Sequence, residues 1–484
     1  MLNHNPKAAD ATASDELVEQ PLYEVRKEIY SRAVSGWFAR WRWGVVFITQ
    51  LVFYGVPWLA WNGRQAVLFD LVARKFYIFG IVFWPQDFIY LTGFLVISAL
   101  SLFLFTAVAG RLWCGYACPQ TVYTEIFMWI ERTVEGDRVA RMRLDQQPLS
   151  ARKLGLKAAK HGLWLALSLW TGFTFVGYFT PIHQLAAEVA GLAASGGQGS
   201  APALGAWEIF WILFYGFATY GNAGWMREQV CKYMCPYARF QSAMFDSDTL
   251  IITYDPERGE PRGPRARNVD ATALGLGHCV DCDLCVQVCP TGIDIRNGLQ
   301  YECIGCAACI DGCNQIMARM GYPKGLIRYT TENALQKKLT SRQVLARSLR
   351  PRVLVYTAIL WAVIIAIGVA LYTRVSLKVD VIRDRASLTR EVDGGWVENI
   401  YRLQIMNTQE KPHRFVIRAS GAPTLQVVDA EAVEIPGATT LMVPVRVRIE
   451  KGRLPVGSHK IEFEVGATDD PALVARERSI FLVR

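Results

Sequence analysis

The sequence CVDCDLCVQVCP at residues 279–290 is followed after a short gap by CIGCAACIDGC at residues 303–313. Both runs have the spacing C-x2-C-x2-C-x3-C, and a complete motif that occurs twice is very unlikely to arise by chance. Three thiolates in a short loop can bind three irons of one cubane cluster, and a fourth, one helical turn later, can reach a second cluster. The two runs therefore predict an α+β module that holds two 4Fe-4S clusters and transfers one electron at a time.

Residues 277–314 resemble the bacterial ferredoxins with two clusters, and this resemblance implies which cysteines share a cluster. It groups Cys279, Cys282 and Cys285 with Cys313. It groups Cys303, Cys306 and Cys309 with Cys289. The second run departs from the ferredoxin pattern at the residue after its last cysteine. This residue is Asn314, whereas Pro290 follows the last cysteine of the first run. A pair of structural zinc sites is the alternative, since sets of four cysteines also suit zinc.

Long uncharged runs elsewhere in the chain predict membrane-spanning helices. Of the 484 residues, 52% are hydrophobic, which is more than an ordinary soluble domain needs. Five runs are each long enough to cross a bilayer core of about 30 Å: Trp43–Trp61, Phe88–Gly110, Gly162–Ile182, Ile209–Met226 and Val353–Thr373. A sixth apolar run, Phe76–Trp84, is too short to cross a membrane, so we predict that it is interfacial or re-entrant.

Basic residues are concentrated between these runs and predict the orientation of the chain in the bacterial cytoplasmic membrane. The net charge of +9 gives little support to nucleic-acid binding, because loops between spans are where topology signals lie. By the positive-inside rule, the N-terminus, the loop between the second and third runs and the segment Arg227–Arg352 are cytoplasmic. The first forty residues lack the apolar core and cleavage site of a removed signal peptide. Five spans then place the C-terminal region outside.

All twelve cysteines lie on the predicted cytoplasmic side or at its membrane face. Thiols that stay reduced there and are clustered at ligand spacing predict metal or cluster ligands instead of disulfides. Four of them form two matched motifs, CGYACP from Cys114 to Cys118 and CKYMCP from Cys231 to Cys235, just past the second and fourth runs. These two runs cross in the same direction, so the four thiols should converge at one level.

Within each motif, residues four apart lie on one face of a helix, so we predict that the two sulfurs are side by side. Pro119 and Pro236 then favour a break or the first turn of a new helix. Arg111 and Arg227 precede the motifs and are predicted to help to lower the thiol pKa. Soft thiolates suit Cu(I), zinc or another iron-sulfur centre, and ordinary buried cysteines are the alternative.

Other residues receive more modest predictions. His161 is interfacial or an extra ligand, His278 is a hydrogen-bonding group beside its cluster, and His183 and His413 lie too far out to join the same site. Residues 250–267 are predicted to form a strand, a turn and a linker, and residues 317–352 a basic helical return to the membrane. The alternating pattern after residue 375 predicts an immunoglobulin-like sandwich with a docking or folding role. Its expected strands are 375–382, 400–406, 414–418, 425–428, 441–450, 459–465 and 479–483.

The predicted architecture is thus an α-helical membrane protein with about five transmembrane helices, an inserted two-cluster ferredoxin-like α+β module and a C-terminal all-β domain. The expected boundaries are a cytoplasmic N-terminal segment (1–40), a four-helix membrane domain with both CxxxCP motifs (41–245), the cluster module (246–350), a fifth transmembrane helix (351–374) and a periplasmic β-sandwich (375–484).

In this order of parts, and in the segments GRLWCGYACPQ (110–120) and YDPERGE (254–260), the chain resembles the cytochrome c oxidase accessory protein family known as FixG, RdxA or CcoG. The resemblance implies a role in the assembly of a cbb3-type oxidase, with Cu(II) reduced to Cu(I) before delivery. It implies a cytoplasmic electron donor, a copper chaperone or copper-exporting ATPase, and oxidase assembly components as partners. The alternatives are a quinol-oxidising subunit that feeds a periplasmic reductase and a copper-binding assembly scaffold without turnover.

Overall fold

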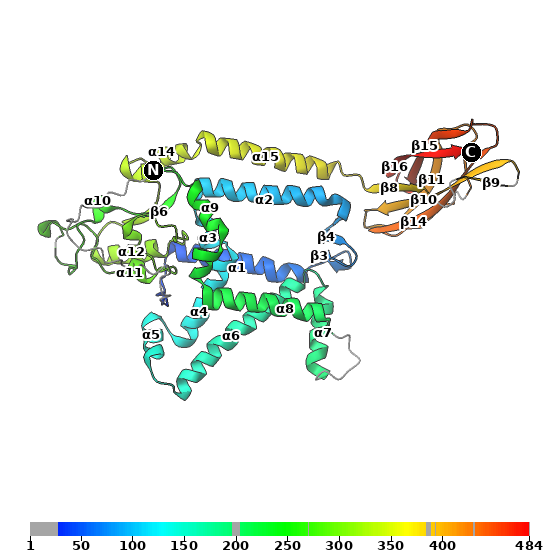
Figure 1. Cartoon of the computed structure of the whole chain (residues 1–484). Helices are drawn as coiled ribbons and strands as arrows, with labels where there is room; N and C mark the ends of the chain where they lie inside the picture. The colour runs from blue at the N-terminus through cyan, green and yellow to red at the C-terminus, as the bar shows by residue number, and fades with distance from the viewer. Residues whose placement is uncertain are drawn as a thin grey trace, which may run out of the picture.

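The computed structural model describes residues 28–195, 204–269, 271–383, 389–392, 394–428 and 431–483. The first 27 residues of the predicted N-terminal segment lie outside the described part. The cluster module lies at one end of the long helices and the β-domain at the other end (Figure 1).

Helices dominate the first half of the chain, and most of the predicted spans fall on them. The fifth predicted span is α15 (Pro351–Tyr372). The other helices of this part are α1 (Trp37–Gly55), η1 (Val56–Trp58), η2 (Pro85–Asp87), α2 (Phe88–Ala109), α3 (Leu112–Tyr116), α4 (Pro119–Glu135), α5 (Arg138–Gln146), α6 (Ala151–Val176), α7 (Ile182–Ser195), α8 (Ala206–Thr219), the π-helical η3 (Tyr220–Met226) and η4 (Val230–Met234), and α9 (Pro236–Met244).

Among the described residues, two helices are long and apolar enough to cross a membrane. They are Pro85–Ala109, with a mean hydropathy of 2.3, and Pro351–Tyr372, with a mean hydropathy of 2.6. They correspond to the second and fifth predicted spans, and their length and composition indicate that the chain is associated with a membrane. The other three predicted spans overlap α1, α6 and α8 with η3, and their crossing of the membrane stays a prediction.

Close backbone contacts hold the long helices in pairs. A Cβ atom on Gly172 of α6 would lie 2.2 Å from the carbonyl oxygen of Ile212 in α8, so only glycine allows this approach. A Cβ on Gly93 of α2 would lie 2.4 Å from the side chain of Ile367 in α15. Small residues at such contacts are typical of helix pairs in membranes.

Two sequence predictions in the membrane region need correction. The run Phe76–Trp84 is not a re-entrant helix, because it contains β4 (Lys75–Ile78) and β5 (Ile81–Phe83), which form an antiparallel sheet with β3 (Val67–Asp70); its interfacial position stays a prediction. The first predicted span also extends too far, because α1 ends at Gly55 and the chain continues into β1 (Ala60–Trp61), paired with β2 (Arg64–Gln65). A short apolar run fits a buried strand as well as a helix, and periodicity alone does not separate them.

The cluster module is closed by a pair of antiparallel strands from its two ends. The strand predicted near residue 250 is confirmed as β6 (Ile251–Tyr254), and it pairs with β7 (Ile327–Thr330). β7 corrects the prediction that residues 317–352 are wholly helical. Between and after the strands lie α10 (Pro256–Gly259), η5 (Thr272–Leu274), α11 (Leu284–Gln287), η6 (Ile295–Asn297), α12 (Ala308–Met320), α13 (Glu332–Gln336) and α14 (Ser341–Ser348).

The C-terminal region is an all-β domain in which two sheets enclose one apolar core. One sheet has the order β12-β14-β10-β8, with β9 also on β10, and the other has the order β13-β11-β15-β16. The core contains the fully buried Phe415, Phe463 and Phe481. Each of the seven predicted strands overlaps an observed one: β8 (Leu377–Arg383), β10 (Trp396–Asn407), β11 (His413–Ser420), β12 (Gln426–Val427), β14 (Thr439–Glu450), β15 (Gly457–Ala467) and β16 (Val474–Val483). The domain also contains β9 (Arg390–Val392) and β13 (Val433–Ile435).

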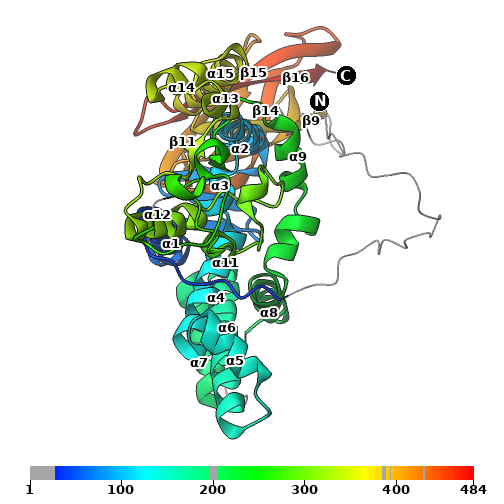
Figure 2. The same cartoon turned by 90° about the vertical axis from the view of Figure 1, so that its left-hand side faces the viewer.

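Polar contacts join the β-domain and the cluster module to the long helices between them. At the β-domain end, the buried carboxylate of Asp87 pairs with Arg374 at 2.6 Å and with Lys378 at 2.7 Å. At the other end, α12 packs beside α1 (Figure 2). The carboxylate of Asp311 in α12 accepts the backbone N–H of Ala39 at 2.8 Å, which satisfies a free donor in the first turn of α1.

Candidate functional site

The two cysteine runs form loops with the same backbone shape. In both loops, the residues directly before and after the second cysteine have positive φ. They are Asp281 (50°) and Asp283 (53°) in the first loop and Gly305 (71°) and Ala307 (60°) in the second. Positive φ is uncommon for residues other than glycine. In each loop the third cysteine then lies in the first turn of a helix, α11 or α12. The repeat that the spacing predicts is therefore present in the backbone.

The eight thiols line two neighbouring cavities. Cys279, Cys282, Cys285 and Cys313 line one of them. Cys289, Cys303, Cys306 and Cys309 line the other, which Cys285 also touches. The fourth cysteine of each run thus lies with the first three of the other run. The second cavity is otherwise walled by isoleucines, Ala307 and Thr291, so sulfur atoms are its main donors. Such a donor set fits an iron-sulfur cluster and suits a hard cation poorly.

Burial raises the pKa of two cysteines in the second loop. It raises the pKa of Cys303 to about 12 and that of Cys306 to about 11. The backbone N–H groups of Gly305 and Ala308 donate to these two sulfurs and act in the opposite direction. Metal binding therefore has to displace protons, and the N–H···S bonds are of the kind that tunes iron-sulfur potentials.

The two CxxxCP motifs do not form continuous helices, which corrects the prediction of sulfurs on one helix face. Cys114 lies in α3, while Cys118 has an extended backbone and caps α4, which begins at Pro119. Cys231 lies in the π-helical η4, while Cys235 is likewise extended and caps α9, which begins at Pro236. The break expected from each proline is confirmed, and it separates the two cysteines of a motif onto successive helices.

The four motif thiols nevertheless lie near one another. Burial raises the pKa of Cys114 to about 11, and negative charge on Cys118 or Cys235 raises it further. Burial also raises the pKa of Cys231 to about 12, with added repulsion from the other three thiols. Among the described residues, no three His, Cys, Asp or Glu side chains are already arranged tightly enough to hold a metal ion. The sulfurs would have to draw together around one.

The prediction that the two arginines help to lower the thiol pKa is confirmed for Arg111. This arginine favours the thiolate at Cys114 and Cys231, although burial outweighs it and raises both pKa values. The Arg111 guanidinium donates to the backbone carbonyls of Tyr301 and Ala238, which fixes it as a structural link. The Arg227 guanidinium pairs with Glu131 at 2.5 Å and not with a thiol.

The motif thiols and the cluster loops are in direct contact. A Cβ atom on Gly115, next to Cys114, would lie 2.7 Å from the carbonyl of Gly305 and 2.8 Å from Cα of Cys306. Cys114 and Cys231 also pack against the apolar group that contains Ile304 and Cys306. Within the described residues, the second thiol cavity and the CxxxCP site are therefore neighbours.

Comparison with known proteins identifies the family. Residues 226–332 match the 4Fe-4S dicluster domain, residues 91–136 a 4Fe-4S binding domain, and residues 367–484 the IG-like fold at the C-terminus of FixG. The chain is 39% identical to the nitrogen fixation protein FixG of Rhizobium meliloti, over 84% of this chain and 82% of that one. It is 38% identical to protein RdxA of Cereibacter sphaeroides, over 88% of each.

The chain belongs to the FixG/RdxA family. This FixG-like chain is therefore an iron-sulfur electron-transfer protein, and the zinc alternative loses its support. Its C-terminal domain is immunoglobulin-like, as predicted. A ferredoxin-type protein of Haemophilus influenzae, NapH, is a more distant relative, 24% identical over 45% of this chain and 65% of that one.

In the described structure, the four histidines considered in the sequence analysis line neither thiol cavity. His278 accepts a hydrogen bond from Arg258 Nε at 3.0 Å and stacks on Tyr322, while burial and then Arg258 lower its pKa. His161 bonds the hydroxyl of Tyr220 at 3.0 Å. The two outer histidines contact other groups: His183 lies against Trp58, and His413 bonds Asp469 at 2.7 Å.

Several residues that position the site carry no sequence signal. Arg42 donates to the carbonyl of Cys306 at 3.1 Å, and the Tyr329 hydroxyl donates to the carbonyl of Gly305 at 2.6 Å. The buried amide of Gln241 lies 3.6 Å from the Cys114 sulfur. Each lies far in sequence from the group that it contacts, so only the folded structure brings the two together.

Proposed function

We propose that the chain crosses the membrane five times, with its N-terminus and cluster module in the cytoplasm and residues 375–484 in the periplasm. Helices at all five predicted spans support this topology. The separation of the cluster module from the β-domain by the length of these helices supports it as well (Figure 1). The absence of cysteine from the β-domain fits an oxidising compartment, where free thiols are vulnerable.

We further propose that each thiol cavity holds one 4Fe-4S cluster. Cys279, Cys282, Cys285 and Cys313 would bind one, and Cys289, Cys303, Cys306 and Cys309 the other. When bound, the clusters supply one-electron transfer. The chain's own contribution is to bury the sulfurs, to direct N–H groups at them and to hold the second loop through Arg42 of α1, Tyr329 of β7 and Arg111 at the start of α3.

The proposed reaction is the reduction of Cu(II) to Cu(I) at Cys114, Cys118, Cys231 and Cys235. A cytoplasmic donor supplies one electron for each copper ion, and the thiols lose protons as sulfur–copper bonds form. Thiolates favour Cu(I) whereas oxygen and nitrogen ligands tolerate Cu(II), so the site stabilises the product. The contact of Gly115 with Gly305 and Cys306 carries this proposal, because it joins the copper site to the electron carrier. Cu(I) would then pass to a chaperone or exporting ATPase for cbb3-type oxidase assembly.

The test uses Cys118→Ser and Cys235→Ser in the purified, anaerobically reduced full-length protein. Each should lose copper binding and Cu(I) formation while it keeps the iron and sulfide content of the wild type. Tyr233→Phe changes the same motif at an exposed side chain without removing a thiol, and it should behave as wild type. Wild-type copper binding and rate in both serine variants would remove these thiols from the mechanism.

A second candidate function for the four thiols is a further iron-sulfur centre. The match of residues 91–136 to a 4Fe-4S binding domain favours it, because this segment contains Cys114 and Cys118. In that case the wild type should contain iron beyond that of two clusters, and the Cys118→Ser and Cys235→Ser variants should lose this excess. Iron that is equal in all three proteins supports the copper site instead.

A further inference from the structure

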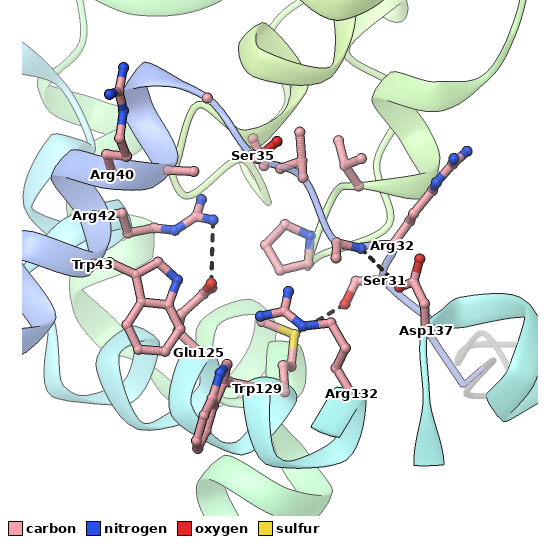
Figure 3. Close-up of a pocket in the computed structure, with 18 of the residues that line it drawn as sticks. Ser31, Arg32, Ser35, Arg40, Arg42, Trp43, Glu125, Trp129, Arg132 and Asp137 are labelled. Carbon is pink, nitrogen blue, oxygen red and sulfur yellow. Dashed lines mark hydrogen bonds and ion pairs between the residues drawn. The ribbon is translucent and has the colours of Figure 1, made fainter. Parts of the chain in front are cut away.

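A cavity of about 530 Å³ lies between the segment 31–36, α1 and α4, at the end of the helices that faces the cluster module (Figure 3). Its inner wall includes Val288, Pro290 and Ala308. These residues adjoin Cys289 and Cys309 in sequence, and both cysteines line the second thiol cavity, so the arginine-lined cavity lies beside it. Neither the electron path nor the copper site described above uses it. Its size is typical of a site for a molecule larger than a simple ion.

The lining of this cavity is strongly basic. Five arginines contribute to it, against two acids, Glu125 and Asp137. Asp137 is engaged with the backbone N–H of Ala33 at 3.1 Å, and Glu125 with Arg42 at 3.4 Å. In the described part of the chain, the side chains of Arg32, Arg40 and Arg132 have no hydrogen bond or ion pair. Within the described residues, the cavity therefore carries an excess of positive charge that no protein group neutralises.

Two guanidinium groups reach into the space itself. Figure 3 shows Arg42 approaching from α1 and Arg132 from α4, near the hydroxyl of Ser31. Arg42 is only 6% exposed, and its Nε has no hydrogen-bond partner in the described structure. A buried donor without a partner is costly, so this one points to an acceptor that the protein does not provide.

The cavity also has an apolar side that continues onto the surface of α1. Trp43 and Trp129 line it, and tryptophan is typical of the membrane–water boundary. Phe47 and Leu51 follow Trp43 on the same face of α1, one and two turns further on, and are 74% and 72% exposed. A free phosphate would use the arginines and leave this stripe uncovered, whereas an amphiphile would cover both.

We propose that the cavity binds the phosphate of an anionic phospholipid, whose acyl chains lie along Phe47 and Leu51. Arg132, Arg42 and Ser31 would contact the phosphate, with Arg32 and Arg40 at the rim. The bound headgroup would join the N-terminal segment, α1 and α4 beside the second cluster loop. This inference rests on the proposed topology, in which α1 lies in the membrane.

The test measures lipid binding to the holoprotein in detergent by native mass spectrometry. Phosphatidylglycerol should bind more tightly than phosphatidylcholine of the same chain length, and soluble glycerol phosphate should not compete at equal concentration. Removing one arginine near an anionic headgroup weakens binding about fivefold, which corresponds to about 1 kcal/mol. Arg132→Gln should show this loss, whereas Arg143→Gln, on exposed α5, makes the same charge change outside the cavity and should not.

Three results would overturn the inference: equal affinity for the two lipids, equal losses in Arg132→Gln and Arg143→Gln, or displacement of the lipid by glycerol phosphate. Iron content equal to that of the wild type shows that each variant is folded. The topology is tested separately with brominated acyl chains, which should quench less fluorescence in Trp43→Phe than in the wild type. Loss of that difference refutes the placement of α1, while the headgroup preference reports on the arginines.

Discussion

Replacing Gly115 by alanine should separate the CxxxCP thiols from the second cluster loop. The added Cβ would lie 2.7 Å from the carbonyl of Gly305, whereas ordinary Cβ contacts begin at 3.4 Å. Because the opposing atoms are backbone, the two segments must move apart by at least about 0.7 Å, and such overpacking costs about 1–3 kcal/mol. This corresponds to a loss of about 5–150-fold in the equilibrium constant for docking the module on α3.

The assay mixes chemically reduced protein rapidly with Cu(II) and follows both the loss of cluster reduction and the formation of Cu(I). Gly115→Ala should slow both together, with iron content and copper affinity close to those of the wild type. A soluble oxidant that reaches the clusters directly should react at the same rate with both proteins. The matched control is Gly155→Ala in α6, where no atom lies within 4 Å of the added Cβ. This control should be neutral or gain up to about 1 kcal/mol of stability.

A wild-type copper rate in Gly115→Ala, together with an unchanged unfolding midpoint, would refute the reasoning. It would mean either that the loop yields without cost or that electrons reach copper by a route that avoids α3. A variant that loses iron would show instead that the contact is needed for cluster loading.

Further substitutions test the contacts that hold the modules together. Tyr401→Phe removes a hydroxyl that donates to the carbonyl of Ile480 at 2.9 Å in the core of the β-domain, so thermal unfolding should show a loss of about 1 kcal/mol. In the wild type the buried Glu131 pairs with Arg141 at 2.7 Å, so Glu131→Gln leaves this arginine without its counter-charge. Chemical denaturation should show a loss of about 3–5 kcal/mol in the free energy of unfolding. Asp311→Ala removes the acceptor at the start of α1 and should cost about 1 kcal/mol, with faster amide exchange confined to the first turn of α1. Wild-type stability in any of the three would show that the contact concerned is not formed or not needed.

The sequence predicts the thiol sets well because ligand spacing is a local property. Three cysteines in one short loop must lie near one another, and the left-handed residues Asp281 and Asp283 only complete a geometry that the spacing requires. The seven strands of the β-domain are predictable for a similar reason, since alternation in a half-buried strand is read directly from neighbouring residues.

The sequence is less informative where distant residues contact the same group. Arg111 favours the thiolate of Cys114, but Tyr301 and Ala238 supply carbonyls that engage its guanidinium, and burial outweighs its effect on the thiol pKa. The helix-face argument for the CxxxCP motifs likewise assumed one continuous helix, whereas the prolines start new ones. The contact of Gly115 with the second cluster loop has no local signal at all, because a glycine in a short helix is equally compatible with open space.

The position of Asp311 links cluster loading to the assembly of the membrane region. Asp311 lies between Cys309 and Cys313 on α12, and its carboxylate binds the N–H groups at the start of α1. The two cysteines belong to different thiol cavities, so α12 is held from both sides only when both sites are filled. Because metal binding contributes folding free energy, loss of either cluster should loosen α12 and with it the capped end of α1. Amide exchange at residues 37–40 should therefore speed up when iron is removed, and it should do so much less in Asp311→Ala, where the cap is already absent.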